Sequence, residues 1–279
     1  MAVDASRLAR GRDDVERAHL VDPADHSFTI ARHPVSPDLA DVGRRFWIPV
    51  WDVPPGHQAP QRVLQYPVCL VVISDTYARF YGVMSGISET VLEGRGWALG
   101  LMLQPAAGYA VTQAPVRRLT DRWMELAEVP GLPGAKLTDQ VRAAMGDAPE
   151  AAPAQATARG AVEGALRSLL PVDDEGLLVN AVVGHVEQTP DLLRVEDLCA
   201  RFDIAERALQ RLLARRIGLS PKWLIRRRRL QEAADLLRDE GPSLAGIAAD
   251  LGYADQPHFT RDFRAATGLT PGEFAARFR

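Results

Sequence analysis

The chain is poor in cysteine and contains no long apolar run. Cys69 and Cys199 are the only cysteines among its 279 residues, which excludes a disulfide framework and a metal site built from several cysteines. No stretch approaches the roughly 18 apolar residues of a membrane-spanning helix. Arg7, Arg10 and Arg12 are not followed by an apolar segment, so no secretory signal is expected. The expected location is a bacterial-type cytoplasm, with no membrane partner.

The overall charge also shows no large excess of either sign. A net charge of −3 gives no indication of nucleic-acid binding, but residues 1–179 carry −5 and residues 180–279 carry +2. Within Arg201–Arg229 there are ten basic residues and two acidic ones. Because phosphates respond to the nearby field, this cluster favours a polyanion-binding surface, with an ordinary solvated helix face as the alternative.

A short pattern occurs twice in the last hundred residues. The first three matched positions of the two copies are separated by 49 residues, and the later matched positions by 50. One residue inserted in the second copy explains this change. Each copy has the pattern of a short helix, a tight turn and an amphipathic helix, which predicts two helix-turn-helix units. The matched pairs are Leu198/Ile247, Phe202/Leu251, Ala205/Ala254, Leu209/Phe259, Arg211/Arg261, Leu213/Phe263, Gly218/Gly268 and Pro221/Pro271.

Local signals place the helices of this region. A glycine can adopt the left-handed backbone conformation that ends a helix, and a Ser or Thr followed by proline can begin the next helix. Both signals occur in Gly218–Pro221 and again in Gly268–Pro271. Thr270 and Glu273 have the spacing of a capping box. The predicted helices are a support helix 176–188, the first unit 196–202 and 205–216, a connecting helix 222–238, and the second unit 243–250 and 255–266.

With these motifs, residues 176–279 resemble the AraC/XylS family of bacterial transcription regulators. The resemblance implies two helix-turn-helix units, joined by a helix, that bind consecutive major-groove segments of double-stranded DNA. One departure is Ala205, where a capping Ser or Thr is usual. The base-reading candidates are Arg207, Gln210, Arg211, Gln256, His258 and Arg261, although His258 could equally be a surface or capping histidine. The phosphate-binding candidates are Arg215, Arg216, Lys222, Arg226, Arg229 and Thr260.

The N-terminal half has a β-type pattern broken by Pro and Gly. Strands are expected at 28–32, 46–53, 68–74, 77–83 and 97–103, which favours a small barrel or sandwich. Trp47 and Trp51 should share one strand face, Pro49 indicates an edge strand, and 68–73 should be a central strand. Helices are expected at 137–145 and 154–170. This half resembles a β-rich variant of the cupin-like domains with which many AraC/XylS members sense an effector or dimerise. The segments that carry the resemblance are 46–53, 62–73, 80–83 and 99–108.

These patterns predict an α+β protein with a β-rich N-terminal domain and an all-α C-terminal domain. The expected division is a flexible tail at 1–25, a β-rich sensor or dimerisation domain at 26–118, a helical segment and linker at 119–172, and the DNA-binding domain at 173–279. A candidate effector pocket would be lined by aromatic residues and one arginine. Its members are Trp47, Trp51, Arg79, Tyr81 and Trp97, and the alternative for each is an ordinary core side chain.

The expected function is a sequence-specific DNA-binding transcription regulator without enzymatic activity, metal or cofactor. His26, His33 and His57 are isolated and do not form the cupin metal signature. Candidate partners are a double-stranded DNA operator, RNA polymerase and a small-molecule effector, and the expected state is a monomer or homodimer. Two alternatives stay open: a repair enzyme that transfers an alkyl group to Cys69, and a constitutive regulator whose N-terminal domain binds a protein.

Overall fold

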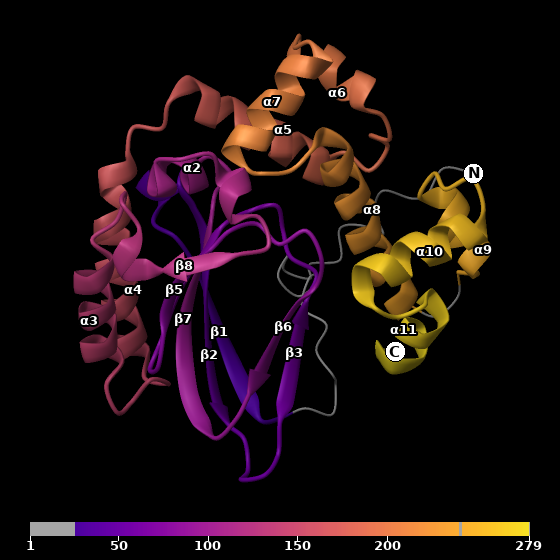
Figure 1. The fold of residues 1–279 in the computed structure, drawn as a ribbon. Helices are drawn as coiled ribbons and strands as arrows, with labels where there is room; N and C mark the ends of the chain where they lie inside the picture. Colours follow the sequence, from indigo (N-terminus) through magenta and orange to yellow (C-terminus); the bar gives the residue numbers. More distant parts are fainter. Residues whose placement is uncertain (1–25, 240–241, 279) are drawn as a thin grey trace.

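A β-rich N-terminal half and a helical C-terminal half make up the computed structural model, which describes residues 26–239 and 242–278 (Figure 1). The predicted α+β fold class is therefore confirmed. The tail predicted at residues 1–25 lies outside the described residues.

Two antiparallel sheets form the N-terminal half. The larger has six strands in the order β1-β2-β7-β4-β5-β8, and β3 pairs with β6 in a separate two-stranded sheet, here called the β3–β6 ribbon. The sequence analysis did not predict β3, β6 or β8. The strands are β1 (Phe28–Pro34), β2 (Gly43–Asp52), β3 (Ala59–Val63), β4 (Leu70–Ser74), β5 (Ala78–Tyr81), β6 (Ser88–Leu92), β7 (Arg95–Leu103) and β8 (Trp123–Glu125).

Strand β2 corrects one prediction and supports another. Pro49 was expected on an edge strand, but β2 lies between β1 and β7. The paired positions of β2 and β7 omit Ile48 and Pro49, so the missing proline N–H falls where this ladder is interrupted. The expected alternation is present, because Phe46 and Ile48 are buried on one face while Trp47 packs on the other.

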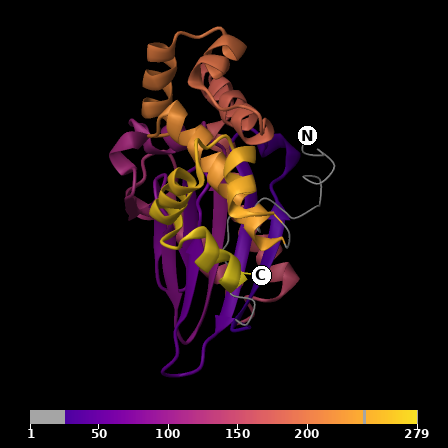
Figure 2. The same cartoon turned by 90° about the vertical axis from the view of Figure 1, so that its right-hand side faces the viewer.

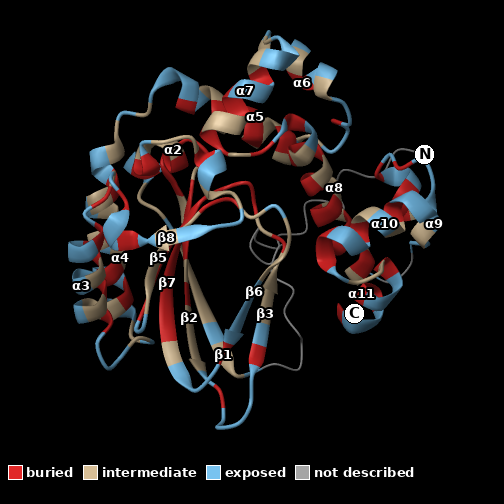
Figure 3. Ribbon diagram, in the orientation of Figure 1, coloured by how far each residue is buried: buried red, intermediate tan, exposed pale blue. Residues whose placement is uncertain are grey.

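The largest core covers one face of the six-stranded sheet. As predicted, β4 is central: it pairs with both β5 and β7, and all five of its residues are buried. Figure 3 shows the buried stretch of the neighbouring strand β7. The helices α2 (Ala107–Thr112), α3 (Gly134–Met145) and α4 (Ala152–Leu166) contribute Val111, Val141 and Val162 to the same cluster.

The C-terminal half consists of helices whose ends follow the predicted signals. The left-handed glycines are Gly218 (φ 78°) and Gly268 (φ 77°), and the Ser220 hydroxyl accepts from the N–H of Trp223. Thr270 and Glu273 form the expected reciprocal capping box. The helices are α5 (Asp174–Gln188), α6 (Val195–Phe202), α7 (Glu206–Arg216), α8 (Pro221–Arg238), α9 (Leu244–Asp250), α10 (Gln256–Thr267) and α11 (Pro271–Phe278).

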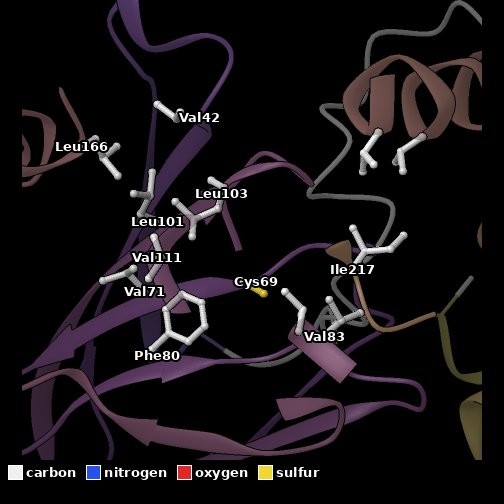
Figure 4. Packing of buried hydrophobic residues seen from close by; sticks show 14 of the residues in the cluster. Val42, Cys69, Val71, Phe80, Val83, Leu101, Leu103, Val111, Leu166 and Ile217 are labelled. Atoms are coloured by element: carbon white, nitrogen blue, oxygen red, sulfur yellow. The ribbon is translucent and has the colours of Figure 1, made fainter. Parts of the chain in front are cut away.

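The two helix-turn-helix units belong to different cores. Leu209 and Leu213 of the first unit, and Ile217 after it, are part of the same cluster as the sheet. Figure 4 shows Ile217 in this packing together with Val83 and Cys69. The second unit has a separate cluster that includes Phe259. Because the larger cluster continues across residues 171–175, the domain boundary placed there stays a prediction.

Candidate nucleic-acid interface

The first predicted recognition helix, α7, has one apolar and one polar face. Leu209 and Leu213 are fully buried, whereas Arg207, Gln210 and Arg211 are exposed. The Gln210 side chain donates to Glu206 over 2.8 Å, so its amide is held on the helix surface. The three side chains predicted to read bases therefore face solvent together.

The second predicted recognition helix, α10, is arranged in the same way. Phe259 is fully buried, and Gln256, His258 and Arg261 are exposed. The Asp255 carboxylate accepts from the backbone N–H of His258 over 2.7 Å and begins the helix. All six base-reading candidates are thus at the surface, and their contacts with DNA remain a prediction.

The phosphate candidates on α7 have partners within the chain. Arg215 donates to Glu175 over 2.5 Å, and Arg216 pairs with Asp173 and Glu175. Arg216 is only 5% exposed, and its guanidinium lies over the Tyr109 ring at 4.4 Å. The assignment of Arg216 to a phosphate therefore has no support in the structure, because burial and two carboxylates already account for its charge.

These ion pairs also change the acidity of their acidic members. The hydrogen bond from Arg216 is the main cause that lowers the pKa of the Asp173 carboxyl. The same arginine is the main cause that lowers the pKa of Glu175, with Arg215 adding to the shift. Asp173 also caps α5 by accepting from Gly176, so this cluster joins the end of α7 to the start of α5.

The phosphate candidates on α8 divide into two groups. Lys222 is exposed, whereas Arg226 pairs with Asp262 of α10 at 3.0 Å. The Arg229 guanidinium lies 3.9 Å from the centre of the Tyr253 ring, in the turn before α10. Arg226 and Arg229 thus connect α8 to the second unit. The remaining candidate, Thr260, is half-buried on α10.

Two residues of the same arginine run were not predicted as functional and are buried. Arg227 and Arg228 are 3% and 7% exposed. Arg228 pairs with Glu232 and donates to the carbonyl of Leu192, in the loop before α6. Successive side chains are about 100° apart around a helix, so the sequence indicated that only one or two of these four arginines can face DNA together.

The turn of the second unit also contacts the loop between α5 and α6. A Cβ added to Gly252, between α9 and α10, would lie 2.7 Å from Cδ1 of Leu193. Gly252 also has a positive φ of 70°. Together with the Arg228–Leu192 bond, this close approach connects the loop before α6 to α8 and to the turn of the second unit.

The five candidate pocket residues do not share one surface. Trp47, Trp51 and Tyr81 pack on the sheet face nearer the ribbon, whereas Trp97 belongs to the core on the opposite face. The register explains this, because Trp97 is paired with Val50 and not with either tryptophan of β2. A single pocket lined by all five residues is therefore not present on either face.

Aromatic rings fix the remaining candidate, Arg79, at the edge of the sheet. Its guanidinium lies 3.8 Å from the centre of the Trp123 ring and 4.8 Å from that of Tyr77. A cavity of about 660 Å³ at one end of the sheet is lined by residues from both faces, Trp51 and Trp97 included.

Within residues 26–239 and 242–278, no helix combines the length and the hydropathy that a bilayer crossing requires. In the same residues no three His, Cys, Asp or Glu side chains are grouped so that they could hold a metal ion.

Comparisons with known proteins agree with the two halves of the fold. Residues 198–277 match the family described as "Helix-turn-helix domain", and residues 31–125 match a "Domain of unknown function (DUF6597)". The activator RhaS of Escherichia fergusonii is 38% identical over 78 residues, 28% of each chain. The uncharacterized regulator YfiF of Bacillus subtilis is 29% identical over 110 residues, 39% of this chain and 35% of that protein. The chain thus matches only about a third of these relatives' length.

Solved structures give a weaker likeness. A probable AraC family regulator from Rhodopseudomonas palustris is 32% identical over 35% of this chain and 94% of its own, with a TM-score of 0.33. ToxT from Vibrio cholerae is 12% identical over 91% of this chain and 99% of its own, with a TM-score of 0.39.

Proposed function

We propose that this chain, which carries an AraC-type helix-turn-helix domain over residues 198–277, is a sequence-specific DNA-binding transcription regulator. The observation that carries the proposal is the matching exposure of three polar side chains on each of two duplicated helices. Arg, Gln and His side chains at such positions can form hydrogen bonds with base edges in the major groove.

The length of the connecting helix supports contact with two successive grooves. Helix α8 has 18 residues, which corresponds to about 27 Å at 1.5 Å per residue. With the turns at its two ends, this length suits recognition helices separated by roughly one DNA turn of 34 Å. The exposed cations Arg207 and Arg211 of α7, Lys222 of α8 and Arg261 of α10 supply positive charge that phosphate binding requires.

Selection of binding sites from random duplexes tests the proposal directly. We expect the intact chain to select two half-sites about ten base pairs apart. Affinity should fall steeply as salt is added, because each phosphate contact releases counterions. Enrichment of no sequence, at any salt concentration, would contradict the regulator proposal.

The predicted role of Arg211 can be tested separately. Arg211→Ala should weaken binding by about 1–3 kcal/mol and relax the base preference at one position of the first half-site. Lys136→Ala removes an exposed cation from α3 and serves as the control for a change in net charge. An unchanged affinity and footprint for Arg211→Ala would remove Arg211 from the base-reading set.

For the N-terminal half we propose sensing of an effector or homodimerisation, with contact to RNA polymerase as part of the regulatory role. The sheet face that carries Trp47, Trp51 and Tyr81 offers aromatic surface for a small ligand. A thermal-shift screen of the full chain against metabolites tests sensing. A stabilising ligand would support it, whereas a complete lack of response would favour a protein partner.

Alkyl transfer to Cys69 is the competing enzymatic hypothesis, and the position of this cysteine argues against it. Cys69 is 3% exposed, and burial raises the pKa of its thiol to about 12. The thiolate, which is the nucleophile in such chemistry, is therefore strongly disfavoured. Incubation with alkylated duplex DNA followed by mass spectrometry should find Cys69 unmodified, and a transferred alkyl group would overturn this assignment.

A further inference from the structure

One end of the β3–β6 ribbon forms hydrogen bonds with the middle of α8. The Arg227 guanidinium donates to the carbonyls of Ser85 and Gly86 over 2.5 and 3.2 Å. The Trp223 indole N–H donates to the same Ser85 carbonyl over 3.3 Å, and the Gln231 amide donates to the carbonyl of Leu64 over 3.2 Å. The acceptors lie just after β3 and just before β6, so α8 binds the backbone where these strands end.

The same contact has an apolar part that completes the second unit's core. Leu64 is fully buried in the cluster of Phe259, and Ile87 packs against that cluster. Neighbouring strand residues point to opposite sides, and Val63 accordingly packs on the sheet face that carries Trp47. Figures 1 and 2 show the second unit beside the ribbon.

The burial of Arg227 indicates that this contact has a required geometry. The guanidinium is bound by backbone carbonyls, its Nη1 has no hydrogen-bond partner, and the Trp223 ring lies 4.6 Å from it. Burial lowers the pKa of Arg227 to about 10. A buried cation is costly unless its surroundings hold it in place, and the planar guanidinium accepts only a narrow range of positions for two carbonyls.

The first unit is attached to the N-terminal half at a different place. Leu213 and Ile217 pack in the core of the six-stranded sheet, and the Thr120 hydroxyl donates to the carbonyl of Gly218 over 3.3 Å. The second unit is attached through the ribbon. Both units are therefore held by the N-terminal half, each through a different sheet, as well as by α8.

We propose that the β3–β6 ribbon belongs to the DNA-reading apparatus: through Arg227 and Gln231 it fixes α8, and so fixes the spacing of the two half-sites that the chain accepts. Arg227 and Gln231 are then positioning residues that need not touch DNA. This inference rests on the proposed function. It assigns to the ribbon, which is part of the N-terminal half, the role of setting the geometry of DNA binding.

The test uses the intact chain and duplexes that carry both selected half-sites at the selected spacing or with one to three base pairs inserted. The wild-type chain should prefer the selected spacing strongly. Arg227→Met and Gln231→Leu, which keep most of the apolar stem but remove the donors, should reduce this preference about tenfold, which corresponds to about 1.4 kcal/mol. Affinity for the first half-site alone should stay within about twofold of the wild-type value.

A control variant and two different negative results distinguish failure of the regulator proposal from failure of the ribbon's proposed role. Lys222→Met removes an exposed cation from α8 and should lower affinity at every spacing equally. If the wild-type chain binds no duplex, the regulator proposal fails. If it shows a spacing preference that Gln231→Leu and a folded Arg227→Met both retain, the role of the ribbon is wrong. Circular dichroism establishes folding, and Gln231→Leu tests the inference even if Arg227→Met does not fold.

Discussion

The two helix-turn-helix units share a sequence pattern but are stabilised by different means. The first, α6–α7, packs Leu209 and Leu213 into the core that covers the sheet. The second, α9–α10, shares a series of neighbouring aromatic rings with α11, among them Phe259 and Phe263 with centroids 5.7 Å apart and Phe263 and Phe274 at 5.2 Å. The first unit therefore depends on distant parts of the chain, and the second depends mostly on itself, α8, α11 and the ribbon.

The two units also differ in helix capping, because only the second has side-chain caps. In the second unit, Ser243 and Asp255 both accept a backbone N–H at the start of their helices. In the first unit, Arg194 and Ala205 are the N-cap residues, and neither side chain caps its helix. A duplicated motif can thus lose its local signals where tertiary packing replaces them.

The largest expected difference concerns the cores. Phe263→Ala should cost about 3–5 kcal/mol, and hydrogen–deuterium exchange should show the loss of protection concentrated in α8–α11. Leu213→Ala should cost about 2–5 kcal/mol and also increase exchange in the six-stranded sheet, because it empties the shared core. The exposed Arg264→Ala is the control. Identical exchange patterns for the two core variants would contradict the separation of the cores.

A smaller effect is expected at the helix starts. Asp255→Ala should destabilise the second unit by about 1 kcal/mol, and Ala205→Ser should stabilise the first by a similar amount. Ala254→Ser, one residue before the cap, is the matched control and should have little effect. Urea unfolding of each variant measures these changes. No gain from Ala205→Ser would show that packing already fixes the start of α7.

The smallest expected effect is on the pH dependence of stability, through the ion pair between Arg216 of the first unit and Glu175. Arg216 holds the pKa of Glu175 below its ordinary value, so the pair stabilises the fold above a pH of about 4.3 and this contribution is lost as the pH falls through the lowered pKa. Glu175→Gln should therefore cost roughly 0.2–1 kcal/mol near pH 7, because the carboxylate is half exposed, and almost nothing near pH 2.

Thermal unfolding of the wild-type chain and Glu175→Gln across this pH range provides the measurement. Asp174→Asn, the exposed neighbour, is the control for a change in net charge. A difference between wild type and Glu175→Gln that persists unchanged to pH 2 would show that the ion pair does not cause it.

The sequence predicted the helical half much better than the sheet. The repeat placed α7 and α10 to within about a residue, because the periodicity and the capping residues are local signals. The ribbon was missed because β3 contains Pro60 and only one strong strand-forming residue, Val63, and because β6 begins with the polar residues Ser88 and Glu89. Strand β8 has three residues and is defined by its pairing with β5.

The candidate site was predicted in part, for a related reason. Exposure of Arg207 and Arg261 follows from helix periodicity. The partners of Arg216 and Arg226 lie 36 to 43 residues away in the sequence and depend on the tertiary fold. The separation of Trp97 from Trp47 depends on strand register, which the composition of a strand does not reveal.

The paired glycines at the ends of α7 and α10 carry unequal constraints. Both need a left-handed backbone, but a Cβ on Gly218 would lie 2.5 Å from the Thr120 hydroxyl, whereas one on Gly268 would have no neighbour within 4 Å. Asparagine, which tolerates this backbone, could therefore replace Gly268 but not Gly218. In a chimaera that receives α7 and α10 from another protein, the junction at Gly218 must be redesigned together with the surface around Thr120. The junction at Gly268 can be exchanged by itself.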